Sequence, residues 1–238
     1  MSQSKGDGSW FDRRSTELTP RSHHERISAQ RAMAMNKVGK MDLLVTGVGG
    51  QGVVLASDII GETALAAGFD VKKTDTLGMA QRGGSVVSHV RLAARVWSPL
   101  IPDGGVDLLL AFEKLEAARW GHHLKRGGIA IVNSYAQPPL SVSLGQESYP
   151  TDDEIITSLK RKTGQVYFVD GTGRARELGN PRTLNLYMLG CFSVFAPIDA
   201  GVWKESISRR MPQNIREINL TAFEAGRKEI EGVRIGKS

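Results

Sequence analysis

The stretch that decides the fold is Thr46-Gly47-Val48-Gly49-Gly50-Gln51-Gly52. It follows an apolar run, residues 41–45, and precedes residues 53–65, which have the pattern of an amphipathic helix. Gly47, Gly49 and Gly52 fit G-x-G-x-x-G at a turn from a buried strand to a helix, the start of a Rossmann-like unit. The helix N-terminus beyond the glycines offers free N–H groups, so an anion is one expected occupant. A partner chain, or close packing of helix on strand alone, is the alternative.

The composition is that of a soluble globular protein. The chain has 238 residues, of which 40% are hydrophobic and 24% charged. No apolar run approaches the roughly 18 residues of a membrane span, so we expect a cytoplasmic protein without membrane contact. The net charge of +6 is concentrated in residues 1–40, which hold eight Lys/Arg and four Asp/Glu. Since the predicted folded part carries little of this excess, we do not expect nucleic-acid binding.

Cysteine and histidine positions limit the metal chemistry. Cys191 is the one cysteine, which excludes an internal disulfide and an iron–sulfur cluster ligated by this chain alone. It lies in an apolar run, residues 189–192, and is expected to be a buried core thiol. His122-His123 end a predicted helix, where they suit the helix dipole. Neighbouring side chains on a helix point about 100° apart, so we predict no metal site.

The remaining pattern alternates strands and helices. Strands are predicted at residues 69–73, 106–112, 129–133 and 165–170, and helices at 113–124, 154–162, 184–195, 202–210 and 213–229. Thr151 and Glu154 form a capping box before the second of these helices, and residues 171–177 are predicted to be a loop containing Arg174 and Arg176. The alternation predicts a Rossmann-like three-layer α/β sandwich with a mostly parallel sheet and a helical C-terminal part. We assign it to residues 41–230, between a polar basic tail (1–40), which we expect to be disordered or loosely docked, and a short tail (231–238).

A second glycine-rich stretch spans residues 76–85. It carries the residues expected to bind an anion or a partner's carboxylate, namely Gln81, Arg82, Gly83, Gly84 and Ser85. Residues 86–92 then alternate, with Val87, His89 and Arg91 on one face, which predicts a half-exposed strand. A plain surface connection is the alternative for the glycine-rich part.

One position suits a bound dinucleotide. Asp75 comes 23 residues after Gly52, near the place where a Rossmann acid meets a ribose hydroxyl. Lys72 and Lys73 beside it suit a ribose phosphate. A free-standing oxidoreductase that uses NAD(P) or flavin is therefore one hypothesis, although an Asp that caps a loop explains Asp75 equally well.

Two motifs together resemble a known family. Gly47-Val48-Gly49-Gly50-Gln51-Gly52, followed by Gly78-Met79-Ala80-Gln81-Arg82-Gly83-Gly84-Ser85-Val86, resemble the γ subunit or γ domain of 2-oxoacid:ferredoxin oxidoreductases. Within that family the chain is most similar to the small subunit of indolepyruvate ferredoxin oxidoreductases. Asn185, Leu189-Gly190 and residues 214–226 resemble the closing pattern of the family.

The resemblance implies a subunit of a larger enzyme. Such enzymes decarboxylate a 2-oxoacid on thiamine diphosphate, pass electrons through iron–sulfur clusters to ferredoxin and transfer the acyl group to coenzyme A. The thiamine diphosphate and the clusters are expected mainly in a large partner subunit, and no catalytic residue is predicted here. Indolepyruvate is the expected substrate, with other aryl or branched 2-oxoacids open, and a pure assembly module is the remaining alternative.

The resemblance also indicates where coenzyme A would lie. In pyruvate-using relatives the γ part helps to hold it near the glycine loop, which here points to Gly49, Gly50, Gln51 and Gly52, with Gln81, Arg82, Gly83 and Gly84 as neighbours. Some relatives place a lysine early in the first helix. This chain has Ser57 and Asp58 there, and a carboxylate would repel a phosphate.

Overall fold

The protein is described by a computed structural model over residues 39–77 and 83–235. The predictions for Gln81, Arg82 and the tail up to residue 38 lie outside these described residues. Within the described chain, six strands form one sheet in the order β2-β3-β1-β4-β5-β6. Their bounds are β1 Met41–Val48, β2 Asp70–Leu77, β3 Ser85–Ala93, β4 Val106–Ala111, β5 Leu124–Asn133 and β6 Gln165–Val169.

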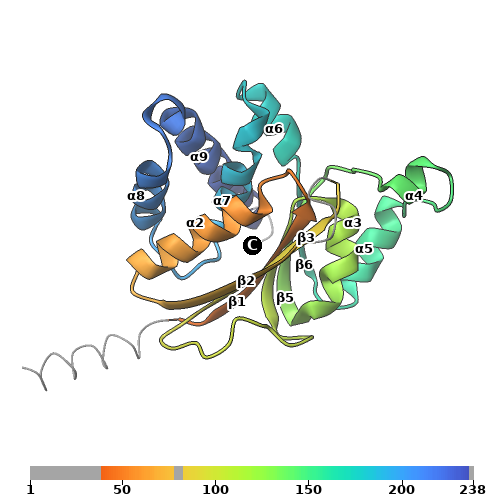
Figure 1. Ribbon diagram of the computed structural model, residues 1–238, viewed down its shortest axis with the longest axis horizontal. Helices are drawn as coiled ribbons and strands as arrows, with labels where there is room; N and C mark the ends of the chain where they lie inside the picture. The colour runs from red at the N-terminus through yellow and green to blue at the C-terminus, as the bar shows by residue number, and fades with distance from the viewer. Residues whose placement is uncertain (1–38, 78–82, 236–238) are drawn as a thin grey trace, which may run out of the picture. The chain divides into compact units, whose positions relative to one another are not determined.

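Helices cover both faces of this sheet (Figure 1). They are α2 Val53–Ala66, α3 Lys114–Trp120, α4 Leu140–Ser143, α5 Asp152–Lys160, α6 Gly171–Glu177, α7 Leu184–Ser193, α8 Ala200–Arg210 and α9 Gln213–Ile235, with 3-10 turns η1 Gly121–His123 and η2 Pro181–Thr183. One face carries α2 and the C-terminal helices, and the other carries α3 and α5. Among residues 39–77 and 83–235, no helix has the length and apolar character of a membrane span.

The strand β1 forms the centre of the sheet because it can be buried on both faces. Leu43, Leu44 and Val45 are completely buried, as a continuous apolar run between two helical layers requires. The strand pairs in parallel with β4, and β4, β5 and β6 continue in parallel. The predicted α/β fold with a mostly parallel sheet is confirmed.

The strand β3 differs from its prediction. It runs antiparallel between β2 and β1, so the first β-α-β unit has another strand inserted between its two strands. The prediction of half-exposure is wrong, because residues 94–105 cover the face that bears His89 and Arg91. His89 accepts a hydrogen bond from the N–H of Ile101 (3.3 Å), and the guanidinium of Arg91 donates to the carbonyl oxygens of Ser98 and Leu100 (both 3.2 Å).

Two short helices show where local sequence signals predict the structure correctly and where they do not. The capping box of Thr151 and Glu154 is present at the start of α5, as predicted. Residues 171–177 are not a loop: they form α6, whose N-terminus is capped by the Asp170 carboxylate bonded to the N–H of Gly173 (2.8 Å). Ala175 of this helix is completely buried, so packing stabilises a segment whose glycines alone favour a turn.

The C-terminal helices contribute much of the core. Trp203, Tyr187, Phe192 and Phe223 are among the largest fully buried side chains of the described residues. The predicted helices at 184–195, 202–210 and 213–229 are confirmed as α7, α8 and α9, with α9 longer than expected. Cys191 is buried in α7, as predicted.

Candidate functional site

The glycine loop, residues 47–52, turns the chain from β1 into α2 at the carboxyl end of the parallel strands. Gly52 is the N-cap of α2 with φ of 83°, and Gly50 has φ of 103°, both in the left-handed region that favours glycine. A Cβ on Gly47 would lie 2.8 Å from Cβ of Phe112, so that position has no room for a side chain. The Oε1 atom of Gln51 accepts the N–H of Val48 at 2.8 Å and closes the loop.

The second predicted stretch lies against this loop. The N–H of Gly49 donates to the carbonyl of Gly84 at 2.8 Å, and the N–H of Gly83 lies 3.5 Å from the carbonyl of Gly49. The structure therefore brings together Gly47, Gly49, Gly50, Gln51 and Gly52 with Gly83, Gly84 and Ser85. Together with the ends of β1, β4 and β5 they form what we call the glycine-loop edge.

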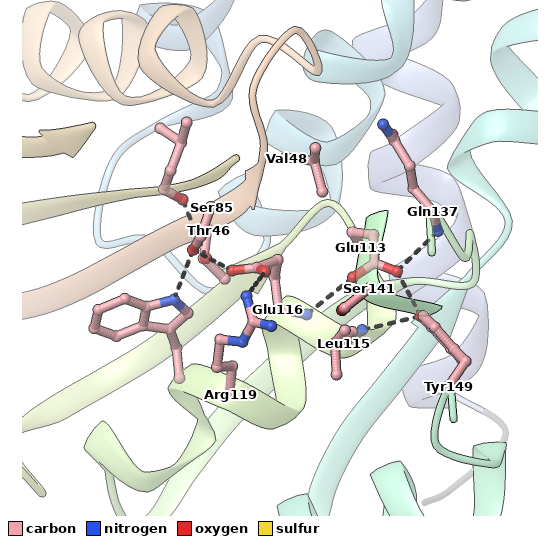
Figure 2. A network of polar contacts seen from close by, with 12 residues as sticks. Thr46, Val48, Ser85, Glu113, Leu115, Glu116, Arg119, Gln137, Ser141 and Tyr149 are labelled. Carbon is pink, nitrogen blue, oxygen red and sulfur yellow. Dashed lines mark hydrogen bonds and ion pairs between the residues drawn. The ribbon is translucent and has the colours of Figure 1, made fainter. Parts of the chain in front are cut away.

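Two buried glutamates beside this edge, Glu113 and Glu116, were not anticipated from the sequence. They are 1% and 3% exposed, and Figure 2 shows their polar contacts. The hydroxyl of Ser85 donates to the Glu116 carboxylate, which also pairs with the guanidinium of Arg119 at 2.7 Å. The indole N–H of Trp120 donates to the oxygen of Ser85 at 3.3 Å. Two side chains of α3 thus hydrogen-bond to Ser85.

The other glutamate joins three segments. Glu113 is the N-cap of α3, where Oε2 accepts the N–H of Glu116 at 2.9 Å. Its Oε1 accepts the N–H of Gln137 at 3.0 Å and the hydroxyl of Tyr149. Burial, followed by this bond to Glu113, raises the pKa of Tyr149 above its usual range, so the hydroxyl remains a donor. The position of Glu113, directly after a buried strand, was the sequence signal for a residue at this edge.

Two clefts open at the glycine-loop edge. Gln137 lines both, and its Oε1 accepts a long hydrogen bond (3.4 Å) from Gln51. The smaller cleft has a volume of about 380 Å³, and its lining includes Gly83, Ser85, Glu116, Arg119 and Leu140. The larger cleft, about 500 Å³, lies at the N-terminus of α2, and its lining includes Gly50, Gln51, Gly52, Tyr135, Thr172, Arg176, Arg182 and Asn185.

The larger cleft, which we call the arginine cleft, has the chemistry of an anion site. Across the described part of the chain, the guanidinium groups of Arg176 and Arg182 make no ion pair. The first turn of α2 contains no acidic residue and its N-cap supplies no side-chain acceptor, so its N–H groups face the cleft without a competing carboxylate. Arg176 belongs to the predicted strand-end loop, whereas Arg182 was not singled out.

Two of the residues proposed for a dinucleotide ribose, Asp75 and Lys73, already have partners within the fold. Asp75 lies within β2 instead of a loop, accepts the hydroxyl of Ser88 at 2.6 Å and pairs with Lys73 at 3.0 Å. Lys73 also pairs with Asp58, whose second oxygen lies 3.4 Å from Arg210. The charge of Asp58 is therefore compensated, which weakens the expected repulsion of a phosphate.

Comparison with known proteins identifies the family. Residues 42–229 match the family model of pyruvate ferredoxin/flavodoxin oxidoreductase. The indolepyruvate oxidoreductase subunit IorB of Thermococcus kodakarensis is 36% identical over 190 residues, covering 79% of this chain and 94% of that relative.

Solved structures share the fold. A keto/oxoacid ferredoxin oxidoreductase γ subunit from Geobacter sulfurreducens has a TM-score of 0.60 at 21% identity, covering 81% of this chain and 99% of that chain. A 2-oxoglutarate:ferredoxin oxidoreductase from Magnetococcus marinus, solved with 2-oxoglutarate, coenzyme A and succinyl-CoA bound, has a TM-score of 0.63 at 20% identity, covering 81% of this chain and 31% of that chain. The glycine-loop edge thus lies in a protein that belongs to the pyruvate ferredoxin/flavodoxin oxidoreductase family, as a small subunit of the 2-oxoacid:ferredoxin oxidoreductase type.

Proposed function

We propose that the chain is the small subunit of a cytoplasmic, thiamine diphosphate-dependent enzyme that oxidatively decarboxylates an aryl 2-oxoacid of the indolepyruvate kind. A larger partner subunit carries the thiamine diphosphate and the iron–sulfur centres, and ferredoxin accepts the electrons. The observation that carries this proposal is the 36% identity with the IorB subunit along 94% of that relative's length. The single cysteine of this chain supports clusters held by the partner, since a cluster needs several thiolates.

In this function the glycine-loop edge completes a site that the partner provides. The hydrogen bonds from Gly49 to Gly84 and from Ser85 to Glu116 fix the backbone of the edge. Leu140 and Leu144 next to it are 73% and 62% exposed. Large apolar side chains beside a polar cleft are typical of a surface that a partner covers.

Coenzyme A belongs to the same proposal, with the arginine cleft as its phosphate site. The cleft volume of about 500 Å³ is within the range of small-molecule sites. Arg176 and Arg182 have the planar donor groups that bind phosphates, and the N-terminus of α2 adds N–H donors. These residues would hold and orient the coenzyme, and the thiamine diphosphate of the partner would supply the acyl chemistry.

Co-purification from the native source tests the proposal. The full chain, carrying an affinity tag, should bring down a large subunit that contains thiamine diphosphate and iron–sulfur clusters. The complex should reduce methyl viologen with an aryl 2-oxoacid, and the large subunit alone should lose most of this activity. A chain that purifies alone and binds NAD(P) or flavin tightly would instead establish a free-standing oxidoreductase. If the large subunit keeps full activity after this chain is removed, only an assembly role remains for the chain.

A further inference from the structure

A histidine–aspartate cluster lies on the α3 side of the sheet, outside both clefts. It consists of Asp103, His122 and His123, whose nearest ligand atoms all lie within 4.8 Å of one another. His122 and His123 form the end of η1, and Asp103 comes from the connection that joins β3 to β4. The expectation that the two neighbouring histidines diverge is not met: their ring centroids are 4.2 Å apart. The helix ends in a 3-10 turn at this point, and Trp120 packs against both rings.

We propose that Asp103, His122 and His123 bind a divalent cation of the zinc class. Two imidazoles and one carboxylate are a donor set that zinc accepts, with the fourth position open to water. Imidazole nitrogens favour zinc, nickel and copper over magnesium and calcium. This site is independent of the proposed 2-oxoacid chemistry.

The contact between Asp103 and His123 supports the cation. Nδ1 of His123 lies 3.0 Å from Oδ1 of Asp103. This nitrogen is buried and has no hydrogen-bond partner in the described chain, so the two atoms are close without the direction of a hydrogen bond. Zinc bonds of about 2.0 Å place tetrahedral ligand atoms about 3.3 Å apart. The observed separation therefore fits two ligand atoms directed toward one cation.

The contact of His122 fixes which nitrogen can bind. Its Nδ1 lies 2.9 Å from the carbonyl oxygen of Arg119. A carbonyl only accepts, so Nδ1 carries the proton and Nε2 keeps its lone pair. Histidine ligands commonly donate their second ring nitrogen to a backbone carbonyl in this way, which orients the ring for the metal.

The cation would join two parts of the fold. Asp103 is 76% exposed, so its side chain can turn to close the site at little cost. Binding would attach residues 94–105, which cover His89 and Arg91, to the end of α3. Trp120, which donates to Ser85 at 3.3 Å, lies between this site and the glycine-loop edge, so we expect its fluorescence to report binding.

Cobalt and zinc titrations of the full chain test this site. The parent protein should carry His23→Gln and His24→Gln, which removes the other adjacent histidine pair of the sequence, and should be freed of metal with a chelator. We expect one Co²⁺ per chain, with the visible bands of tetrahedral cobalt, displacement by Zn²⁺ and quenching of tryptophan fluorescence. Asp103→Asn, His122→Gln and His123→Gln should each weaken binding at least tenfold.

An exposed aspartate elsewhere provides the control. Asp153→Asn removes a carboxylate from the start of α5 and should leave cobalt binding unchanged. Circular dichroism and the melting temperature of each variant without metal identify a fold defect. If a variant is defective, Asp103→Ala provides the test in its place, because the Asp103 side chain is 76% exposed. Equal cobalt binding by the parent, by the Asp103 variant and by the histidine variants, or no binding by the folded parent, would overturn the site.

Discussion

Tyr149 provides the clearest test of the buried glutamate at the glycine-loop edge. Its hydroxyl donates to Glu113 and accepts the N–H of Leu115 at 3.1 Å. Tyr149→Phe removes only this oxygen, which leaves the N–H of Leu115 without its acceptor and the carboxylate short of one donor. We expect the free energy of unfolding to fall by about 1–3 kcal/mol, measured by guanidinium denaturation.

Another tyrosine supplies the matched control for that substitution. The hydroxyl of Tyr135 makes no hydrogen bond to the rest of residues 39–77 and 83–235. Tyr135→Phe should therefore change stability by only a few tenths of a kcal/mol. Equal losses in the two variants would mean that the Glu113 hydrogen bonds contribute nothing specific to stability.

Cys191 allows a test of core packing with one thiol. The side chain is completely buried, and burial raises the pKa of the thiol above its usual range. The thiolate is the reactive form, so the native protein should resist Ellman's reagent, and the thiol should react quickly in guanidinium. Reaction of the native protein at the rate of an exposed thiol would contradict the packing of α7.

At the scale of elements, α7 and α9 cross at two glycines. A Cβ on Gly190 would lie 2.0 Å from the carbonyl oxygen of Phe223, and one on Gly226 would lie 2.0 Å from that of Tyr187. Both obstacles are backbone atoms, so the helices must separate to admit a methyl group. Gly190→Ala and Gly226→Ala should each reduce the free energy of unfolding by about 3 kcal/mol, measured by guanidinium denaturation.

The same helix contains a control for the glycine crossing. Gly232 is exposed in α9, and nothing lies within 4 Å of the Cβ that it would gain. Alanine has the higher helix propensity, so Gly232→Ala should stabilise the protein by up to about 1 kcal/mol. A similar loss of stability at all three positions would argue against a close crossing of α7 and α9.

The elements that local signals specify were predictable from the sequence. The buried run of β1, the glycine turn into α2 and the capping box of α5 each depend on neighbouring residues only. The wrong predictions concern segments that are buried by residues distant in the sequence. Residues 94–105 bury the outer face of β3, and packing of Ala175 stabilises α6 despite its glycines. Alternation and turn propensity cannot report such contacts.

The candidate site was predictable only in part for the same reason. The glycine loop and Gly83–Ser85 are local motifs, and the structure brings them together. The position of Glu113 after a buried strand signals the edge, but only the fold buries Glu113 and Glu116 against Tyr149 and Ser85. Arg182 enters the arginine cleft from η2, a segment that follows β6. The role of Arg82 stays a prediction.

At the scale of the whole molecule, the proposed function requires the arginine cleft to work within an assembled enzyme. Arg176→Gln and Arg182→Gln each remove one positive charge from the cleft. Arg174→Gln is the control, because the Arg174 side chain lies on α6 like Arg176 but is exposed and pairs with Glu177. A charged hydrogen bond contributes roughly 1.5 kcal/mol, which corresponds to about tenfold in affinity. Each cleft variant should therefore raise the KM for coenzyme A about tenfold in the purified complex, measured by 2-oxoacid-dependent viologen reduction, with an unchanged KM for the oxoacid and a normal yield of complex. If the KM for coenzyme A does not change while the complex still depends on this chain, the coenzyme binds elsewhere and the subunit role is retained. If the KM for the oxoacid rises instead, the cleft is closer to the substrate than to the coenzyme.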